Sequence, residues 1–172
     1  MFKSATVRLF VLSIMSLVAF SGRSNAQAVS ASGSAVTSTG LNSTVSLLAY
    51  VNGTSVVGNA KIQFATCYFT GYAEAISTPN VDSKGMSTAV VTVYGYIVQN
   101  VGGATTKVIG YVSVTQAPGT NGAVMSAFYN YNTSKTLVQN LVSPGSAFTT
   151  GVITNTPMSL KSGGVMITKP AS

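Results

Sequence analysis

The sequence predicts an all-β protein, a single-domain antiparallel β-sandwich of an immunoglobulin-like or jelly-roll-like kind with about eight to ten strands. Three observations predict it. The chain is built from short runs rich in Val, Ile, Thr, Tyr and Phe, the residues that favour strands. Pairs of turn-forming residues separate these runs at spacings close to the 8–12 residues typical of sandwiches. Almost no stretch shows the apolar period of an amphipathic helix.

The expected strands follow one another along the chain. The strand regions are residues 43–51, 55–77, 86–99, 107–116, 123–132, 135–142, 146–154 and 163–169. The turn formers around them are Asn52-Gly53, Pro79-Asn80, Lys84-Gly85, Gly102-Gly103, Pro118-Gly119, Asn121-Gly122, Pro144-Gly145 and Pro157.

Residues 90–116 are expected to form a hairpin around the loop 100–105. Successive residues of a strand point to opposite faces, so the valines of the two arms share one face. The tyrosines of the hairpin, Tyr94, Tyr96 and Tyr111, then gather on the reverse side. Gly-Tyr pairs at 71–72, 95–96 and 110–111 suggest a repeated structural device. A glycine in a strand lets an aromatic ring lie across the backbone or lets the sheet bend.

The N-terminus shows the three-part pattern of a secretory signal peptide. Lys3 and Arg8 form a basic region, residues 9–20 are apolar but too few to span a bilayer, and Ala26-Gln27-Ala28 is a small-x-small cleavage pattern. We therefore expect residues 1–28 to be removed. The mature protein is expected to be secreted or displayed at the cell surface, with bacterial export favoured over eukaryotic export.

The mature chain is expected to begin with a flexible leader. Residues 29–42 consist largely of Ser, Ala, Gly and Thr, a composition typical of linkers. Residues 43–172 then form the β-sandwich domain, since a chain of this length can bury one core.

The positive charge of the mature chain is modest. Six lysines remain against two acids, a net charge of about +4, and the lysines are spread evenly along the chain. No arginine remains for bidentate phosphate contacts, so nucleic acid is not expected as a partner. A weak, unspecific attraction to anionic cell surfaces is what this charge predicts.

The residues needed for catalysis are scarce. The chain has no histidine, which removes the commonest general base and metal ligand. Glu74 and Asp82 are its two acids, and they would have to form any carboxylate pair. Residues 80–85 resemble a calcium loop only faintly, because Lys84 occupies a ligand position; we interpret them as a turn. We expect a non-enzymatic protein without a cofactor or metal.

Tyrosines are the candidate binding residues. Tyr94, Tyr96 and Tyr111 are interpreted first as cross-strand aromatics that close a half-buried face, with ligand contact as the alternative. Tyr129 and Tyr131 alternate with asparagines near an expected turn, which favours exposure. They form the preferred contact site.

Candidate assembly residues lie in the leader and at the single cysteine. Val29 and Val36 could enter the sheet of a neighbouring molecule if the leader acts as a donor strand. Cys67 is expected to be buried because Phe64, Tyr68 and Phe69 surround it, and an intermolecular disulfide is the alternative.

Two function hypotheses follow. The first is a secreted, non-enzymatic structural or adhesive protein of the cell surface or extracellular matrix, including a fibre subunit that self-assembles by strand addition. The second is a carbohydrate- or peptide-binding module that uses exposed tyrosines. The partners are then another copy, a cell-surface or matrix component, or a glycan, without a stable membrane span. An outer-membrane barrel would share the alternating strands, but the uneven strands and the ending KPAS favour the sandwich.

Overall fold

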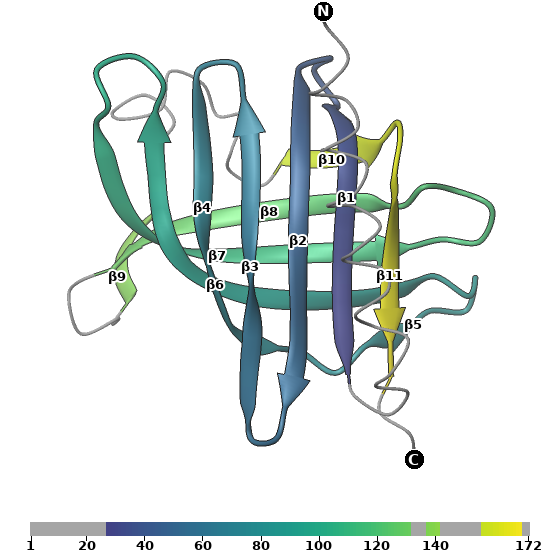
Figure 1. Cartoon of the computed structure of the whole chain (residues 1–172). Helices are drawn as coiled ribbons and strands as arrows, with labels where there is room; N and C mark the ends of the chain where they lie inside the picture. The colour runs from purple at the N-terminus through teal and green to yellow at the C-terminus, as the bar shows by residue number, and fades with distance from the viewer. Residues whose placement is uncertain (1–26, 132–136, 142–155, 170–172) are drawn as a thin grey trace, which may run out of the picture.

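A computed structural model describes residues 27–131, 137–141 and 156–169 of the chain (Figure 1). The elements in these ranges are β1 (Ala28–Thr37), β2 (Asn42–Asn52), β3 (Ser55–Phe64), β4 (Cys67–Ile76), β5 (Asn80–Val81), β6 (Ser87–Gln99), β7 (Thr105–Gln116), β8 (Ala123–Tyr131), β9 (Leu137–Leu141), β10 (Thr156–Leu160) and β11 (Gly164–Thr168). All pairings between them are antiparallel, so the prediction of an all-β, antiparallel protein is confirmed. No helix in the described part of the chain is long and apolar enough to cross a membrane. Residues 1–26 of the expected signal peptide, the side chain of Tyr131 and the expected strand 146–154 lie outside what the structure describes, whereas Ala28, the last residue of the expected signal peptide, begins β1.

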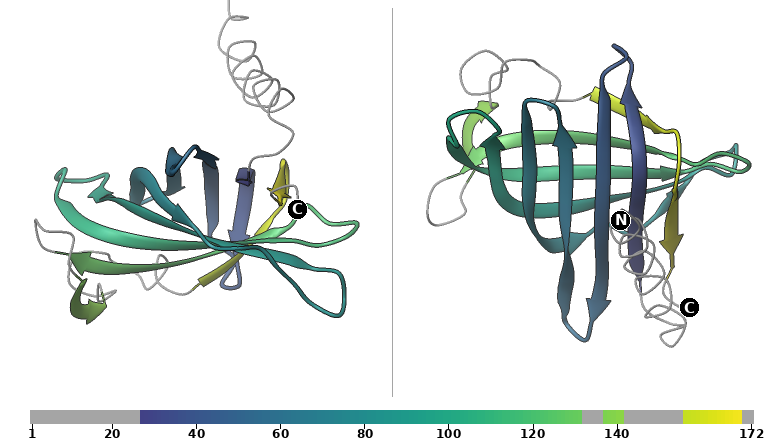
Figure 2. Two further views of the ribbon diagram at one scale, coloured as in Figure 1. Left: turned by 90° about the horizontal axis from the view of Figure 1, so that it is seen from below. Right: turned by 45° about the horizontal axis from the view of Figure 1, so that its top comes forward.

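The described strands belong to one continuous sheet with the order β10-β1-β2-β3-β4-β6-β7-β8-β9. Strand β10 pairs with β1 on one side and with β8 on the other, so hydrogen bonding closes into a ring. Strands β1 to β4 stand steeply across the long ribbons of β6, β7 and β8 (Figures 1 and 2). The expected sandwich would have two separate sheets; here two halves of one curled sheet enclose the core.

The core is formed by alternate residues that point inward from both halves. Ile62 and Phe69 of one half and Ile97 and Phe128 of the other are all at most 1% exposed. The rings of Phe69 and Phe128 meet with their centroids 4.6 Å apart. Burying each such side chain contributes roughly 1.5–3 kcal/mol to folding, so these contacts join the two halves of the sheet.

The predicted hairpin is confirmed. Strands β6 and β7 pair from Ser87↔Gln116 to Val98↔Thr105. Val91, Val93, Val108, Val112 and Val114 are fully buried, whereas Tyr94, Tyr96 and Tyr111 alternate with them and are half-buried or exposed. Alternation along these two strands was therefore a sufficient guide to which side chains face the core.

The interpretation of residues 29–42 as a flexible leader is wrong for the first part of that range. Ala28–Thr37 forms β1, which pairs with β2 along its length and with β11 and β10 on its other side. Its small residues suit this position because neighbouring backbones come very close. A Cβ atom on Gly33 would collide with the carbonyl oxygen of Ser162, at the point where β1 changes partner from β11 to β10.

Of the turn predicted at residues 80–85, the part from Asp82 to Gly85 is confirmed, whereas Asn80–Val81 forms the short strand β5. The Asp82 carboxylate accepts hydrogen bonds from the backbone N–H groups of Lys84 and Met86, at 2.8 and 2.9 Å. The carboxylate therefore stabilises the link into β6 as an Asx-type turn.

Candidate functional site

Among the tyrosines whose side chains are described, six lie on the outer face of the sheet, over strands β4, β6, β7 and β8. We call this surface the tyrosine face, and its members are Tyr68, Tyr72, Tyr94, Tyr96, Tyr111 and Tyr129. Each directly follows a buried residue or a glycine of its strand, and because successive residues point to opposite faces, the tyrosines lie on the outer face. The face thus joins residues that are up to 61 positions apart in sequence.

Cross-strand pairing holds these rings against one another. Tyr72 and Tyr94 are directly opposite, and their ring centroids are 6.2 Å apart. Tyr111 and Tyr129 meet edge to face at 5.7 Å. Both distances lie within the range of favourable aromatic pairs. These four rings are therefore held against one another by the sheet before any ligand binds.

Ile109 shows how the rings cover the sheet. It lies opposite Tyr94 on β6 and Tyr129 on β8, and it is 2% exposed although it does not belong to the inner core cluster. The tyrosines on either side thus shield it from water. Part of the tyrosine face is an outer hydrophobic cluster, as the interpretation of cross-strand aromatics expected.

Two tyrosines of the face keep nearly half of their surface exposed to solvent. Tyr72 is 48% exposed and Tyr96 is 44% exposed. A ring that keeps almost half of its surface in water while its neighbours are ordered offers a rigid, amphipathic contact area. These two rings are the strongest candidates for direct contact with a partner.

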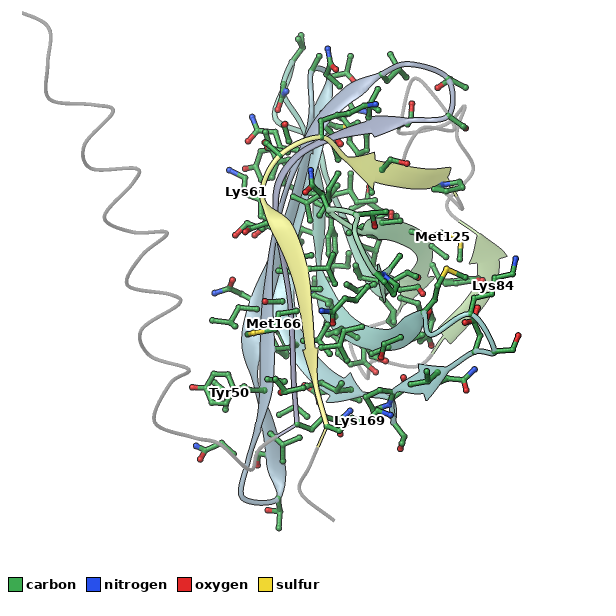
Figure 3. All side chains as sticks on the ribbon, turned by 90° about the vertical axis from the view of Figure 1, so that its right-hand side faces the viewer. Tyr50, Lys61, Lys84, Met125, Met166 and Lys169 are labelled. Carbon is green, nitrogen blue, oxygen red and sulfur yellow. The ribbon has the colours of Figure 1, made fainter. Side chains whose placement is uncertain are left out.

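A row of outward-facing residues with a lysine at each end crosses the same face. The row runs Lys61, Thr70, Tyr96, Lys107 in direct cross-strand register over β3, β4, β6 and β7. With a strand spacing of about 4.8 Å, the backbones of the two lysines are about 14 Å apart. The Lys61 ammonium lies 4.9 Å from the centre of the Tyr68 ring, and Figure 3 shows Lys61 projecting from the outer side of the sheet.

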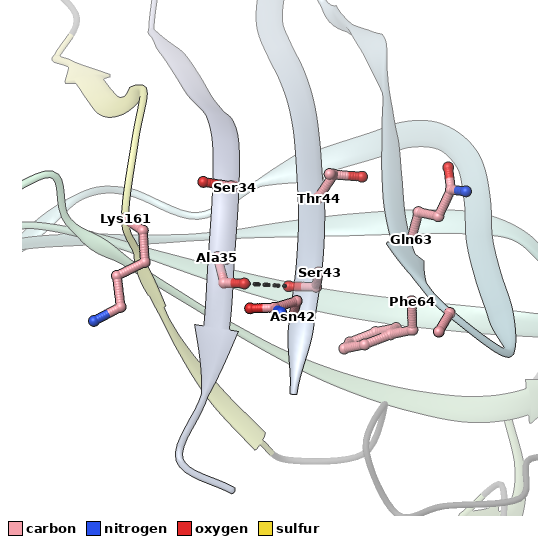
Figure 4. Close-up of a pocket in the computed structure, with 9 residues that line it drawn as sticks. Ser34, Ala35, Asn42, Ser43, Thr44, Gln63, Phe64 and Lys161 are labelled. Atoms are coloured by element: carbon pink, nitrogen blue, oxygen red, sulfur yellow. Dashed lines mark hydrogen bonds between the residues drawn. The ribbon is translucent and has the colours of Figure 1, made fainter. Parts of the chain in front are cut away.

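A groove lined by both polar and apolar residues borders this row. It encloses about 510 Å³ where β1, β2 and β3 meet the loop after β10 (Figure 4). Its lining residues are Ser34, Ala35, Asn42, Ser43, Thr44, Gln63, Phe64, Ala65 and Lys161. Gln63 pairs with Tyr68 in register, so the groove adjoins the tyrosine face. Ser43 is 5% exposed and its hydroxyl donates to the Ala35 carbonyl at 3.4 Å. The Ser34 hydroxyl is hydrogen-bonded to that of Ser162 at 2.7 Å, so the amides of Asn42 and Gln63 and the ammonium group of Lys161 are the main candidates for ligand contact.

The structure brings together most of the predicted binding residues. The tyrosine face contains Tyr94, Tyr96, Tyr111 and Tyr129. However, their order of solvent exposure differs from the prediction, which favoured Tyr129 as the exposed contact residue. Tyr129 is half-buried against Tyr111, whereas Tyr96 is more exposed. Tyr131 is placed in β8 opposite Leu137.

Several site residues were not predicted as such. Tyr72, Lys61, Lys107 and the groove around Gln63 have no local sequence motif, because cross-strand register alone brings them together. The repeated Gly-Tyr pair at residues 71–72 was the one available signal for Tyr72.

The proposed assembly residues lie inside the fold. Val29 is 0% exposed between Ala49 and Ile167, and Val36 is half-buried between Asn42 and Ser159. Neither residue can therefore serve as a free donor strand in this arrangement. Cys67 is 3% exposed, so its predicted burial is confirmed and the alternative of an intermolecular link is not supported. Burial raises the pKa of the Cys67 thiol, and a hydrogen bond from Thr66 partly opposes this.

The two acids occupy separate structural settings. Glu74 is exposed at a bulge in β4, and Asp82 holds the turn before β6. Within the described ranges, no group of three or more His, Cys, Asp or Glu side chains could hold a metal ion. The arrangement on the tyrosine face is suited to binding by rings, hydroxyls and ammonium groups.

No protein-family model, curated protein or solved structure matches this chain.

Proposed function

We propose that this protein is a secreted, non-enzymatic adhesive protein of the cell surface or extracellular matrix, and that it adheres through the tyrosine face. The observation that carries the proposal is the exposure of Tyr72 and Tyr96, at 48% and 44%, on one face of the sheet. The Tyr72 ring packs against Tyr94, and Tyr96 lies between Thr70 and Lys107 in cross-strand register. Preordered tyrosines give contact area at a low cost in conformational entropy.

The chemistry of the face favours adhesion over catalysis. Outward neighbours of the two exposed rings are hydroxyl, amide and ammonium groups, such as Thr70, Asn59 and Lys107. These groups bind partners through hydrogen bonds and charge, and a proton-transfer role would need a group that titrates near neutral pH. Export follows from the sequence pattern of residues 1–28.

Adhesion by strand addition is the less favoured form of this function. The segment that was expected to act as donor strand is β1, which already has partners on both sides. A carbohydrate-binding role is compatible with the tyrosine face, because aromatic rings together with hydroxyl and amide groups are what sugar rings contact. A saccharide-bearing surface is therefore the partner to test first.

The test compares adhesion of the wild-type protein with that of a double variant, Tyr72→Ala with Tyr96→Ala. Purified mature protein coated on beads is applied to immobilised cell-surface and matrix polysaccharides, and bead retention is measured. Losing both rings should reduce retention about tenfold or more, since each aromatic contact contributes roughly 0.5–1.5 kcal/mol.

The matched control is Val81→Ala with Val101→Ala. These side chains are 45% and 85% exposed and lie in β5 and in the β6–β7 loop, and neither is a member of the tyrosine face, so retention should be unchanged. Circular dichroism would confirm that both double variants are folded. Equal retention of wild type and the tyrosine variant would refute the proposal.

A further inference from the structure

We infer that the ligand of the tyrosine face is an acidic polysaccharide, bound along the row Lys61, Thr70, Tyr96, Lys107. The inference rests on the proposed adhesive function and adds the chemical class of the ligand. It is carried by the register that places an exposed ring between two exposed cations.

The row offers three kinds of contact in one line. The Tyr96 ring can stack on the C–H face of a sugar, the Thr70 hydroxyl lies next to it, and Lys107 is its direct neighbour on β7. On the other side Lys61 lies over the Tyr68 ring, so a second ring and a second ammonium group are within reach. An extended chain of sugars that carries carboxylates matches this order of ring, hydroxyl and cation.

The groove extends the same surface toward a third cation. Gln63 lies two residues from Lys61 on the same outward face of β3 and also lines the groove, whose far side carries Lys161. The Lys161 backbone is fixed by a 2.8 Å hydrogen bond from its N–H to the Ser34 carbonyl. A polymer bound along the row can thus turn at Lys61 and continue along β3 past Gln63 to a groove that again presents an ammonium group.

The charges around the row favour an anion. The described acids are Glu74 and Asp82; Glu74 is four residues along β4 from Thr70, and Asp82 is committed to the turn before β6. Four residues of a strand span roughly 13 Å, beyond a Debye length of about 10 Å at 0.1 M salt. The lysines therefore dominate the local potential.

Other anionic polymers fit less well. Nucleic acid would be expected to use arginine, which the mature chain lacks, and closely clustered cations. An anionic lipid surface would be expected to meet a contiguous apolar patch, whereas Thr70, Asn59 and Gln63 surround these rings. A polysaccharide uses separated charges together with stacking.

The experiment measures binding to acidic polysaccharides and to the same polymers with their carboxylates neutralised by esterification. Polygalacturonate, alginate and hyaluronan are immobilised beside their methyl esters, and mature protein is titrated at low and high salt. The expected result is binding to at least one acidic form, weaker binding to its ester, and a decrease as salt rises.

Charge variants locate the contact. Lys61→Gln with Lys107→Gln should weaken binding to the acidic polymer about fivefold, the combined effect of two exposed charge pairs. Lys84→Gln with Lys169→Gln changes the net charge equally at exposed positions off the row and should leave binding almost unchanged. If both double variants lost the same amount of binding to the acidic polymer, the assignment of the contact to the row would be overturned.

The outcomes separate this inference from the proposed function. Equal binding to acid and ester, lost in the tyrosine double variant, would overturn the inference and leave adhesion through the tyrosine face standing. No binding to any acidic polymer would likewise overturn it, while bead retention on other surfaces tests adhesion independently. Tighter binding to single-stranded DNA or to anionic vesicles than to every acidic polysaccharide would assign the row to that other class.

Discussion

Gly71 and Gly95 lie directly opposite each other on β4 and β6, and neither position has room for a side chain. A Cβ atom on Gly71 would collide with the carbonyl oxygen of Tyr94, and one on Gly95 with that of Thr70. Each glycine directly precedes an exposed tyrosine, Tyr72 or Tyr96. The close approach of the two backbones therefore sets where the two rings of the contact surface stand.

Gly95→Ala should destabilise the protein and disturb the tyrosine face together. Because the methyl group would meet backbone atoms that cannot rotate away, the free energy of unfolding should fall by about 2 kcal/mol or more. Urea unfolding followed by tyrosine fluorescence measures this. Gly164→Ala is the matched control: a Cβ atom there meets nothing within 4 Å, so its effect should be within about 0.5 kcal/mol. If the two variants were equally stable, β4 and β6 would be able to move apart around the added methyl group without a loss of stability, which would contradict the prediction.

The Gly-Tyr pairs also show what sequence could and could not predict. Period-two alternation correctly placed Tyr94, Tyr96 and Tyr111 opposite the buried valines, because one face of the β6–β7 hairpin is covered. A third pair has another cause: a Cβ atom on Gly110 would lie 3.0 Å from the rings of Phe69 and Phe128, so this glycine makes room for the core aromatics. Single-sequence patterns identify such glycines but not which backbone or ring they accommodate.

Long-range pairing accounts for what sequence missed. Small residues in β1 looked like a linker because composition does not reveal that β2, β10 and β11 lie on both sides of them. The lysine row likewise depends on register between residues 61, 70, 96 and 107, which no local motif encodes. One sheet closed by β10, rather than two, follows from pairings across more than 120 positions, such as Val36↔Ser159.

Neighbouring substitutions in β1 test whether this segment is a core strand or a free leader. Ala31 is 0% exposed and Ser32 is exposed. Ala31→Asp would bury an unpaired charge, so we expect the free energy of unfolding to fall by about 3 kcal/mol or more. Ser32→Asp adds the same charge to the outer side and should cost less than about 0.5 kcal/mol. A free leader would tolerate both substitutions, and chemical denaturation of the two variants distinguishes these cases.

Cys67 should be chemically quiet in the folded protein. Burial raises the pKa of its thiol above the ordinary value of 9.0, so the reactive thiolate is scarce at pH 8. A chromogenic disulfide reagent should label native protein at least about tenfold more slowly than urea-unfolded protein, and a non-reducing gel should show monomer. Since the folded pKa exceeds the unfolded pKa, the associated stabilisation is fully present below pH 9 and is lost as the pH rises through the folded value. Rapid native labelling, or stability that rises with pH in this range, would contradict the burial of Cys67.

If the N-terminal segment is cleaved during export, as the sequence pattern predicts, we expect the mature protein to begin at Gln27 rather than at Val29. Cleavage after Ala28 would remove the Gln27 carbonyl, which accepts a 2.9 Å hydrogen bond from the Val51 N–H, and would place a charged α-ammonium group on a residue that is 0% exposed. Burying such a charge without a partner is costly. Cleavage after Ala26 leaves the charge on Gln27, which is only part-buried.

The sequence permits this earlier cut, because Ser24 and Ala26 also form a small-x-small pattern. Intact mass spectrometry of protein secreted by a bacterial host determines the first residue. Ser24→Lys breaks the earlier pattern and leaves Ala26 and Ala28 intact, so any processed product should then start at Val29. That shortened product should unfold at lower urea concentration than wild type, because it lacks the Gln27 and Ala28 contacts to β2. If the wild-type protein began at Val29 and were as stable as a form that begins at Gln27, the contacts of Gln27 and Ala28 would not contribute to the stability of the fold.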